Sequence, residues 1–109
     1  MILLKILTAA ELFAMALEVG YTKPDARRIT CIARYESDFK TYAVNKNIIT
    51  QDHGILQIND VWLDTPGKGC FGLNPYNVYE SLICAKRIVK QQGWNAWVAY
   101  NKNKTECDR

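Results

Sequence analysis

The chain has 109 residues, of which 49% are hydrophobic and 23% are charged. This length suits one globular domain, and the composition excludes a disordered chain. The net charge of +3 is mild, so it indicates no nucleic-acid partner and only weakly favours an anionic partner such as a bacterial wall.

The four cysteines lie far apart in the sequence, at Cys31, Cys70, Cys84 and Cys107. An even number of cysteines is compatible with two disulfides and therefore with an oxidising compartment. A zinc site would need two cysteines close together, as in Cys-x2-Cys, and this chain has no such pair. Four cysteines allow three pairings, and their spacing alone does not choose among them.

The N-terminal segment 1–7 is similar to the start of a signal peptide. However, Lys5 and then Glu11 interrupt the apolar run, and no small-residue cleavage site precedes a polar start. We therefore predict a secreted protein whose leader is not in this chain. No apolar run is long enough to span a bilayer, so no membrane insertion is expected.

Two amphipathic helices are predicted in the first third of the chain. The first covers residues 8–19, with Thr8 as its N-cap and Gly20 as its stop. The second covers residues 24–37 and begins with a proline suited to a first helical turn. Its inward face carries Ala26, Ile29, Ile32 and Ala33.

The middle of the chain changes character. Residues 40–60 are rich in β-branched and aromatic side chains, and Asn45-Lys46-Asn47 is typical of a turn, so we expect three short antiparallel strands ending near Asn59. Strand-forming residues there include Thr41, Tyr42, Val44, Ile48, Ile49 and Thr50. Glycine and proline without periodicity predict a loop over 61–76.

Helical spacing returns after this loop. We predict a third long helix over about 77–90, a break at Gly93, a short final helix over 94–100, and a polar tail from Asn101.

Helices followed by a small sheet and more helices predict an α+β fold, taken as one domain over 1–109. A helical lobe would comprise about 1–39 and 77–109, and a sheet lobe about 40–76. The groove between two such lobes is a natural binding site.

Two carboxylates stand out against this background. Glu36 lies on the inward side of the second helix near its C-terminal end, where the helix dipole disfavours a negative charge. Asp52 opens a stretch with strand character. An acid in an apolar setting stays protonated while another in a polar setting stays ionised, which is the division of labour that glycosidic cleavage requires.

Several sequence motifs lie in a fixed order along the chain: Cys31-x-Ala33-x-Tyr35-Glu36-Ser37-x-Phe39, Asp52-x-Gly54-Ile55-Leu56-Gln57-Ile58-Asn59-x-x-Trp62, Cys84-Ala85-Lys86-Arg87-Ile88-Val89 and Asn95-Ala96-Trp97-Val98-Ala99-Tyr100. With these motifs in this order, the chain resembles the C-type (animal) lysozyme/α-lactalbumin family over nearly its whole length.

The resemblance implies a lysozyme-like fold and a secreted, bacteriolytic and antimicrobial glycosidase that cuts peptidoglycan. Glu36 matches the general acid, and Asp52 matches the carboxylate that attacks or stabilises the sugar cation. The implied saccharide-binding residues are Asn45, Asn47, Gln57, Asn59, Trp62, Ala96, Trp97 and Val98. The substrate would be peptidoglycan or a chito-oligosaccharide, no cofactor is needed, and the protein is expected to act as a monomer.

The physics fits these roles. An apolar neighbour, for which Trp97 is the candidate, would raise the pKa of Glu36 toward the working pH. Asparagine amides would keep Asp52 ionised. The family's retaining route needs carboxyl groups closer together than an inverting route does.

The cysteine set departs from the family, which usually has eight. Ala10 and Asp64 stand at two cysteine positions, and a third is missing near Leu73. The resemblance then implies the disulfides Cys70–Cys84 and Cys31–Cys107, although the family's cysteine aligns with Lys104 rather than Cys107.

The cleft sequence departs from the family too. Leu63 replaces a second cleft tryptophan, and Ile48-Ile49-Thr50-Gln51 makes the hairpin one residue shorter. His53 stands where the family has tyrosine, and we predict a structural role for it. Residues 74–77 lack the aspartates of a calcium site, so no metal is predicted.

Two rival functions follow from the same motifs. An α-lactalbumin-like binding protein without activity is supported by Leu63, but such relatives commonly lose one or both carboxylates, and both are present here. A lytic transglycosylase shares a Glu-Ser and a Gly-x-x-Gln-Ile motif, but Asp52 argues against it. Direct membrane disruption would need a basic amphipathic segment.

Overall fold

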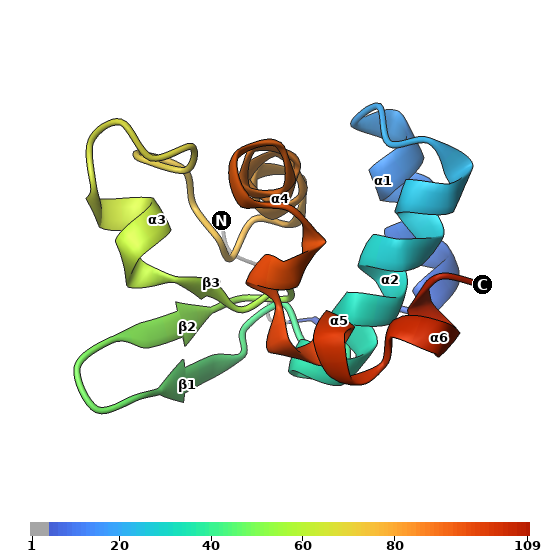
Figure 1. Cartoon of the computed structure of the whole chain (residues 1–109), viewed down its shortest axis with the longest axis horizontal. Helices are drawn as coiled ribbons and strands as arrows, with labels where there is room; N and C mark the ends of the chain where they lie inside the picture. The colour runs from blue at the N-terminus through green and yellow to red at the C-terminus, as the bar shows by residue number, and fades with distance from the viewer. Residues whose placement is uncertain (1–4) are drawn as a thin grey trace.

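The computed structural model describes residues 5–109 and confirms the predicted α+β fold. The first four residues of the segment compared above with a signal peptide lie outside the described residues. Most of the helices lie on one side of the molecule, and the small sheet lies on the other together with the short helix α3 (Asp60–Asp64), with α4 (Val78–Gln92) between them (Figure 1). The elements are α1 (Ala9–Glu18), α2 (Lys23–Ser37), β1 (Val44–Lys46), β2 (Gln51–His53), β3 (Ile58–Asn59), α3 (Asp60–Asp64), α4 (Val78–Gln92), η1 (Trp94–Ala96), α5 (Val98–Lys102) and α6 (Lys104–Cys107).

Helix α1 begins where its capping residues predict. The hydroxyl of Thr8 accepts the backbone N–H of Glu11 at 3.1 Å, and the Glu11 carboxylate accepts the N–H of Thr8 at 2.9 Å. This reciprocal capping satisfies two backbone donors that the first turn leaves unpaired. After the helix, Gly20 adopts a φ of 101°, which ends the helix and turns the chain toward α2.

Helix α2 forms the centre of the helical lobe. Thr22 caps its start by accepting the N–H of Asp25, and its predicted inward residues are fully buried. The helix ends at Ser37, because Asp38 and Phe39 both adopt positive φ, at 52° and 63°. This reversal sends the chain from Glu36, in the last turn, toward the sheet.

The sheet has the antiparallel order β1-β2-β3. Its register places Asn45 opposite Asp52, and Asp52 opposite Asn59. The strands are shorter than the sequence suggested. Ile48 and Ile49 form the tip of the β1–β2 hairpin, where they are 101% and 90% exposed, so their strand-forming side chains are not in a strand.

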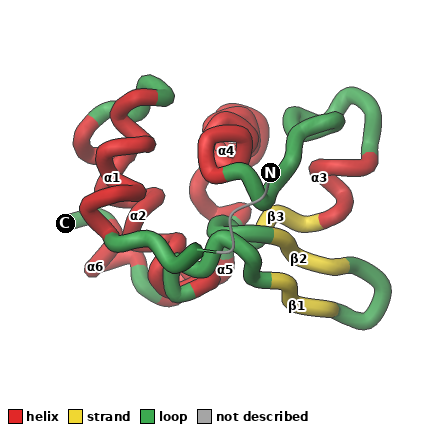
Figure 2. Tube along the Cα trace, turned by 180° about the vertical axis from the view of Figure 1, so that it is seen from behind, coloured by secondary structure: helices red, strands yellow, loops and turns green. Residues whose placement is uncertain are grey.

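Three further expectations need correction. The predicted loop over 61–76 begins inside α3, whose start is capped by the Asn59 side chain. The predicted helix over 94–100 is divided into η1 and α5 by the extended residue Trp97. The polar tail, for which no helix was predicted, contains α6. Figure 2 shows these short helices beside the loops that join them.

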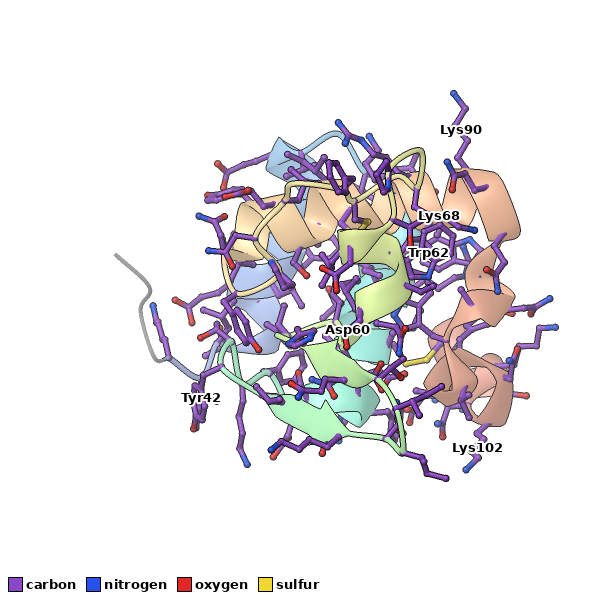
Figure 3. The ribbon with its side chains drawn as sticks, turned by 90° about the vertical axis from the view of Figure 1, so that its left-hand side faces the viewer. Tyr42, Asp60, Trp62, Lys68, Lys90 and Lys102 are labelled. Atoms are coloured by element: carbon purple, nitrogen blue, oxygen red, sulfur yellow. A yellow bond between two sulfur atoms is a disulfide. The ribbon has the colours of Figure 1, made fainter. Side chains whose placement is uncertain are left out.

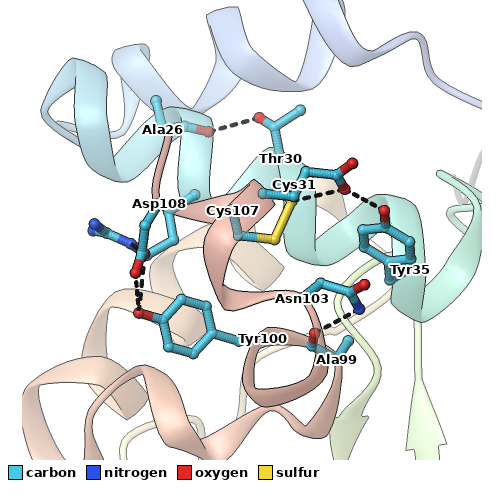
Figure 4. Close-up of a disulfide and its surroundings, with 11 residues drawn as sticks. Ala26, Thr30, Cys31, Tyr35, Ala99, Tyr100, Asn103, Cys107 and Asp108 are labelled. Carbon is cyan, nitrogen blue, oxygen red and sulfur yellow. Dashed lines mark hydrogen bonds and ion pairs between the residues drawn. A yellow bond between two sulfur atoms is a disulfide. The ribbon is translucent and has the colours of Figure 1, made fainter.

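Two disulfides join distant segments, and they are the pairs that the resemblance implied. Cys31–Cys107 links α2 to α6, and Cys70–Cys84 links the long loop to α4. Figure 4 shows the first of these with Asp108 bonded to Tyr100 beside it. The displaced Cys107 reaches Cys31 because α6 turns the tail back over α2.

The turn at 54–57 fixes the sheet lobe to the helical lobe. Its residues Ile55 and Leu56 are fully buried in the common core. Their carbonyls accept hydrogen bonds from the Ser37 hydroxyl at 2.6 Å and the Trp97 indole at 2.9 Å. These bonds satisfy backbone groups that burial would otherwise leave unpaired.

Gly54 should be one of the least replaceable residues of the fold. It has a φ of 80°, and a Cβ there would lie 2.1 Å from the carbonyl oxygen of Pro75. We expect Gly54→Ala to lower the free energy of unfolding by about 2–5 kcal/mol, from backbone strain plus the clash. Gly67 has a φ of 90° and open space around it, so Gly67→Ala should cost only about 1–2 kcal/mol. Urea unfolding of both variants measures the difference; equal costs would contradict the proposed close contact.

Candidate active site

A groove of about 390 Å³ lies between the two lobes. The C-terminal end of α2 and the 96–98 segment form its helical side, while the sheet and α3 form the other. It is lined by Glu36, Asn47, Asp52, Gln57, Ile58, Asn59, Trp62, Ile88, Ala96, Trp97 and Val98. Both candidate carboxylates therefore face one cavity.

Glu36 occupies the drier side of this groove. Burial raises the pKa of Glu36, and the nearby negative charge of Asp52 raises it further. The backbone N–H of Ala99 acts in the opposite direction by stabilising the carboxylate. Trp97, the predicted apolar neighbour, is 4% exposed and lines the same groove. The result is a carboxyl group suited to hold and donate a proton.

Asp52 occupies a polar setting in the middle strand of the sheet. One of its carboxylate oxygens accepts the side-chain amide of Asn59 at 2.9 Å, and the other accepts that of Asn47 at 3.3 Å. Thr50 accepts from the same two amides and thereby orients them. The two asparagines that the sequence placed beside Asp52 thus donate one hydrogen bond to each of its carboxylate oxygens.

Trp62 stands on α3 at the edge of the groove, where it is half-buried. The ammonium group of Lys68 lies 5.1 Å from the centre of its indole ring, a cation–π distance. Figure 3 shows Trp62 and Lys68 together above Asp60. An indole held in this way offers a flat face on which a sugar ring can stack.

The structure gathers most of the residues that the sequence predicted for binding. Asn47, Gln57, Asn59, Trp62, Ala96, Trp97 and Val98 all line the groove. Asn45 does not. Its amide donates to the side chain of Gln57 at 2.6 Å, so it contacts a groove residue without lining the groove itself.

Sequence reasoning missed two apolar lining residues, Ile58 and Ile88. Both belong to buried faces, one on β3 and one on α4. Hydrophobic periodicity identifies such residues as core and carries no signal that part of the side chain reaches a groove.

Nothing in residues 5–109 gathers three or more His, Cys, Asp or Glu side chains in a way that would hold a metal ion. Within the same residues, no helix combines the length and apolar character needed to cross a membrane.

Comparison with known proteins decides the family. A model of the C-type lysozyme/alpha-lactalbumin family matches residues 5–108. The chain belongs to the C-type lysozyme/α-lactalbumin family. Lysozyme C of Crax fasciolata is 38% identical to it, over 91% of this chain and 88% of the relative. Lysozyme C-1 of Sus scrofa is 35% identical over 81% and 75%, and Lysozyme 1 of Musca domestica is 35% identical over 82% and 69%.

The structure shows where the residues that depart from the family's usual sequence lie. Leu63, at the position of a second cleft tryptophan, lines a different hollow beside His53 and Tyr76 rather than the groove. The exposed Ile48 and Ile49 lie at the hairpin tip and do not line the groove either. Leu63, Ile48 and Ile49 therefore lie outside the groove that holds Glu36 and Asp52.

Replacing Glu36 should stabilise the fold in a pH-dependent manner. An acid whose pKa is raised by folding binds its proton more tightly in the folded state, so its ionisation destabilises the fold as the pH rises above about 4.3, the ordinary value for Glu. Glu36→Gln should therefore be more stable than the wild type at pH 7, and the difference should vanish below pH 4.

Thermal unfolding across pH 3 to 7 measures this difference. Asp52→Asn should also lower the pKa of Glu36 toward its ordinary value, which a carbon-13 NMR titration of the Glu36 carboxyl would show. A pH-independent stability difference would mean that Glu36 is no more buried than an ordinary surface acid.

Proposed function

We propose that this protein hydrolyses the β-1,4 bond between N-acetylmuramic acid and N-acetylglucosamine in bacterial peptidoglycan. One observation carries the proposal: Glu36 and Asp52 face a single groove from opposite lobes, the first with a raised pKa and the second with asparagine donors on both oxygens. Family membership supports the same chemistry.

In this mechanism Glu36 donates its proton to the leaving glycosidic oxygen. Asp52 then stabilises or attacks the positively charged sugar that forms, and a water activated by the deprotonated Glu36 completes a retaining hydrolysis. Lysozyme is the type case for this general scheme. Apart from the attacking water, the groups that carry out the reaction are side chains of the chain itself, so it uses no cofactor.

Saccharide binding is assigned to the polar and aromatic wall of the groove. Trp62 would stack on a sugar ring, while Asn59 and Gln57 would meet its hydroxyl and amide groups. Two disulfides fit a protein that works outside the cell, and we propose a secreted monomer acting on wall or chito-oligosaccharide chains.

Clearing of a bacterial wall suspension tests the function. Loss of a general acid typically costs about 10²–10⁴-fold in rate, so Glu36→Gln should clear at least 100-fold more slowly than the wild type. Asp52→Asn should also be strongly impaired. Glu18→Gln removes a carboxylate at the far end of α1, where it is bonded to Tyr79, and should clear at the wild-type rate.

The products separate the rival activities. Hydrolysis gives a new reducing end, and the retaining route gives it first in the configuration of the substrate, which proton NMR detects. An anhydro ring would identify a transglycosylase instead. Equal clearing by the wild type and Glu36→Gln would remove the role of Glu36. Saccharide binding without any clearing would make the protein a binding member of the family.

A further inference from the structure

The carboxylate of Asp60 is bonded to the residues on both sides of Asp52 in the chain. It is the first residue of α3, and its side chain points back to the sheet. One carboxylate oxygen accepts the backbone N–H of Gln51 at 2.8 Å. The other lies 2.6 Å from Nε2 of His53. The residues immediately before and after Asp52 are thus bonded to one carboxylate.

The register of the sheet explains the first of these bonds. Asp52 pairs with Asn59 in the β2–β3 ladder, so the next pair would join Gln51 to Asp60. The chain enters α3 at Asp60, and its backbone leaves the ladder there. The Asp60 side chain supplies the acceptor that a continued strand would have supplied to Gln51. The Asp60 side chain therefore completes the β2–β3 ladder at the point where the Asp60 backbone no longer can.

The bond between Asp60 and His53 also connects Asp60 to the long loop. Nδ1 of His53 lies 2.6 Å from the hydroxyl of Tyr76, whose ring meets the imidazole edge-on at 5.6 Å. The contacts with His53 and with the N–H of Gln51 hold the pKa of Asp60 below its usual range. Ionised Asp60 accepts only, so His53 must carry a proton on Nε2.

We propose that Asp60, acting through Gln51 and His53, is a positioning residue that fixes the backbone on which Asp52 stands. The proposal rests on the proposed function, because it concerns the placement of the carboxylate assigned to that reaction. It also gives His53 a definite part, as the relay that connects Asp60 to the loop at Tyr76.

The need for such a device follows from the sheet itself. β2 has three residues and β3 has two, so few ladder bonds hold Asp52 in place. The asparagine amides orient its carboxylate but do not fix its backbone. A displacement of about 1 Å from productive geometry can lower a rate by about 100-fold. A grip on both neighbours restricts such a displacement.

The test compares two substitutions at the same position. Asp60→Ala removes both bonds and should lower kcat on a soluble chito-oligosaccharide by about 10- to 100-fold while KM changes less than threefold. Asp60→Asn can keep both bonds. Its side-chain carbonyl accepts the Gln51 N–H, and its side-chain NH2 donates to Nε2 of His53. His53 then takes the tautomer protonated on Nδ1, from which it donates to the hydroxyl of Tyr76. Asp60→Asn should retain kcat within threefold.

Thr8→Ala is the matched control for stability. Like Asp60→Ala, this substitution removes a side chain at the start of a helix that accepts a backbone N–H. The helix in this case is α1, which lies away from the groove. All variants are measured well below their unfolding temperatures. Thr8→Ala should leave kcat unchanged even where it destabilises the protein as much as Asp60→Ala does.

A second readout does not depend on turnover. The negative charge of Asp52 raises the pKa of Glu36, so a less well-placed Asp52 should raise it less. Asp60→Ala should lower the pKa of Glu36 in a carbon-13 NMR titration, whereas Asp60→Asn and Thr8→Ala should leave it near the wild-type value.

The outcomes distinguish this proposal from the proposed function. Wild-type activity together with an unchanged kcat and an unchanged Glu36 titration in Asp60→Ala would overturn the positioning role alone. An inactive wild-type protein would overturn the function, and the Glu36 titration would still decide whether Asp60 places Asp52. A fall in kcat matched by Thr8→Ala would assign Asp60 to stability and overturn the proposal.

Discussion

The insertion of the turn at 54–57 into the helical core is the interaction on which the groove depends. The sheet has no independent core, since its exposed β1 and two-residue β3 bury little apolar surface. Ile55 and Leu56 supply the missing burial. Their carbonyls are bonded by Ser37, the neighbour of Glu36, and by Trp97, the wall beside it. The contacts that dock the sheet are therefore made by residues next to Glu36, so they also set where the two carboxylates lie relative to each other.

This arrangement concentrates unfavourable terms around Glu36. A carboxylate in the last turn of α2 opposes the helix dipole, is partly desolvated, and faces the negative charge of Asp52. Each effect favours the protonated form. A site that breaks local rules in this manner is typical of function rather than of stability, because the rest of the fold must offset its cost.

The sequence predicted the long elements well, because each is specified locally. Thr8 and Thr22 cap α1 and α2, and the inward residues of α2 recur at helical spacing, so both helices were found within a residue or two. The carboxylates and most of the groove were found through motifs rather than periodicity. Asn45 shares a sheet face with its partner Asp52 but does not line the groove, because its amide is bonded to the side chain of Gln57, a long-range contact that the motif does not reveal.

The missed elements are the ones that depend on tertiary contacts. Helix α3 has five residues, and its start is set by Asn59, whose side chain also serves Asp52. Helix α6 has four residues and is fixed by the Cys107 disulfide and by the bonds of Asp108 to Arg28 and Tyr100. Isolated helices of such length are unstable, so propensity alone cannot reveal them.

The polar chain through His53 also shows how the loop is held without the family's full set of cysteines. Asp64 and Leu73, near two of the absent cysteines, line the same hollow as His53, Asp60 and Tyr76. A disulfide there would contribute about 2–4 kcal/mol by restricting the unfolded chain, whereas each hydrogen bond contributes only about 1 kcal/mol and acts in the folded state alone. Hydrogen bonds are directional, however, and those of Asp60 end on Gln51 and His53, the two neighbours of Asp52. A disulfide would restrain the loop as a whole, whereas these hydrogen bonds restrain strand β2, which carries Asp52.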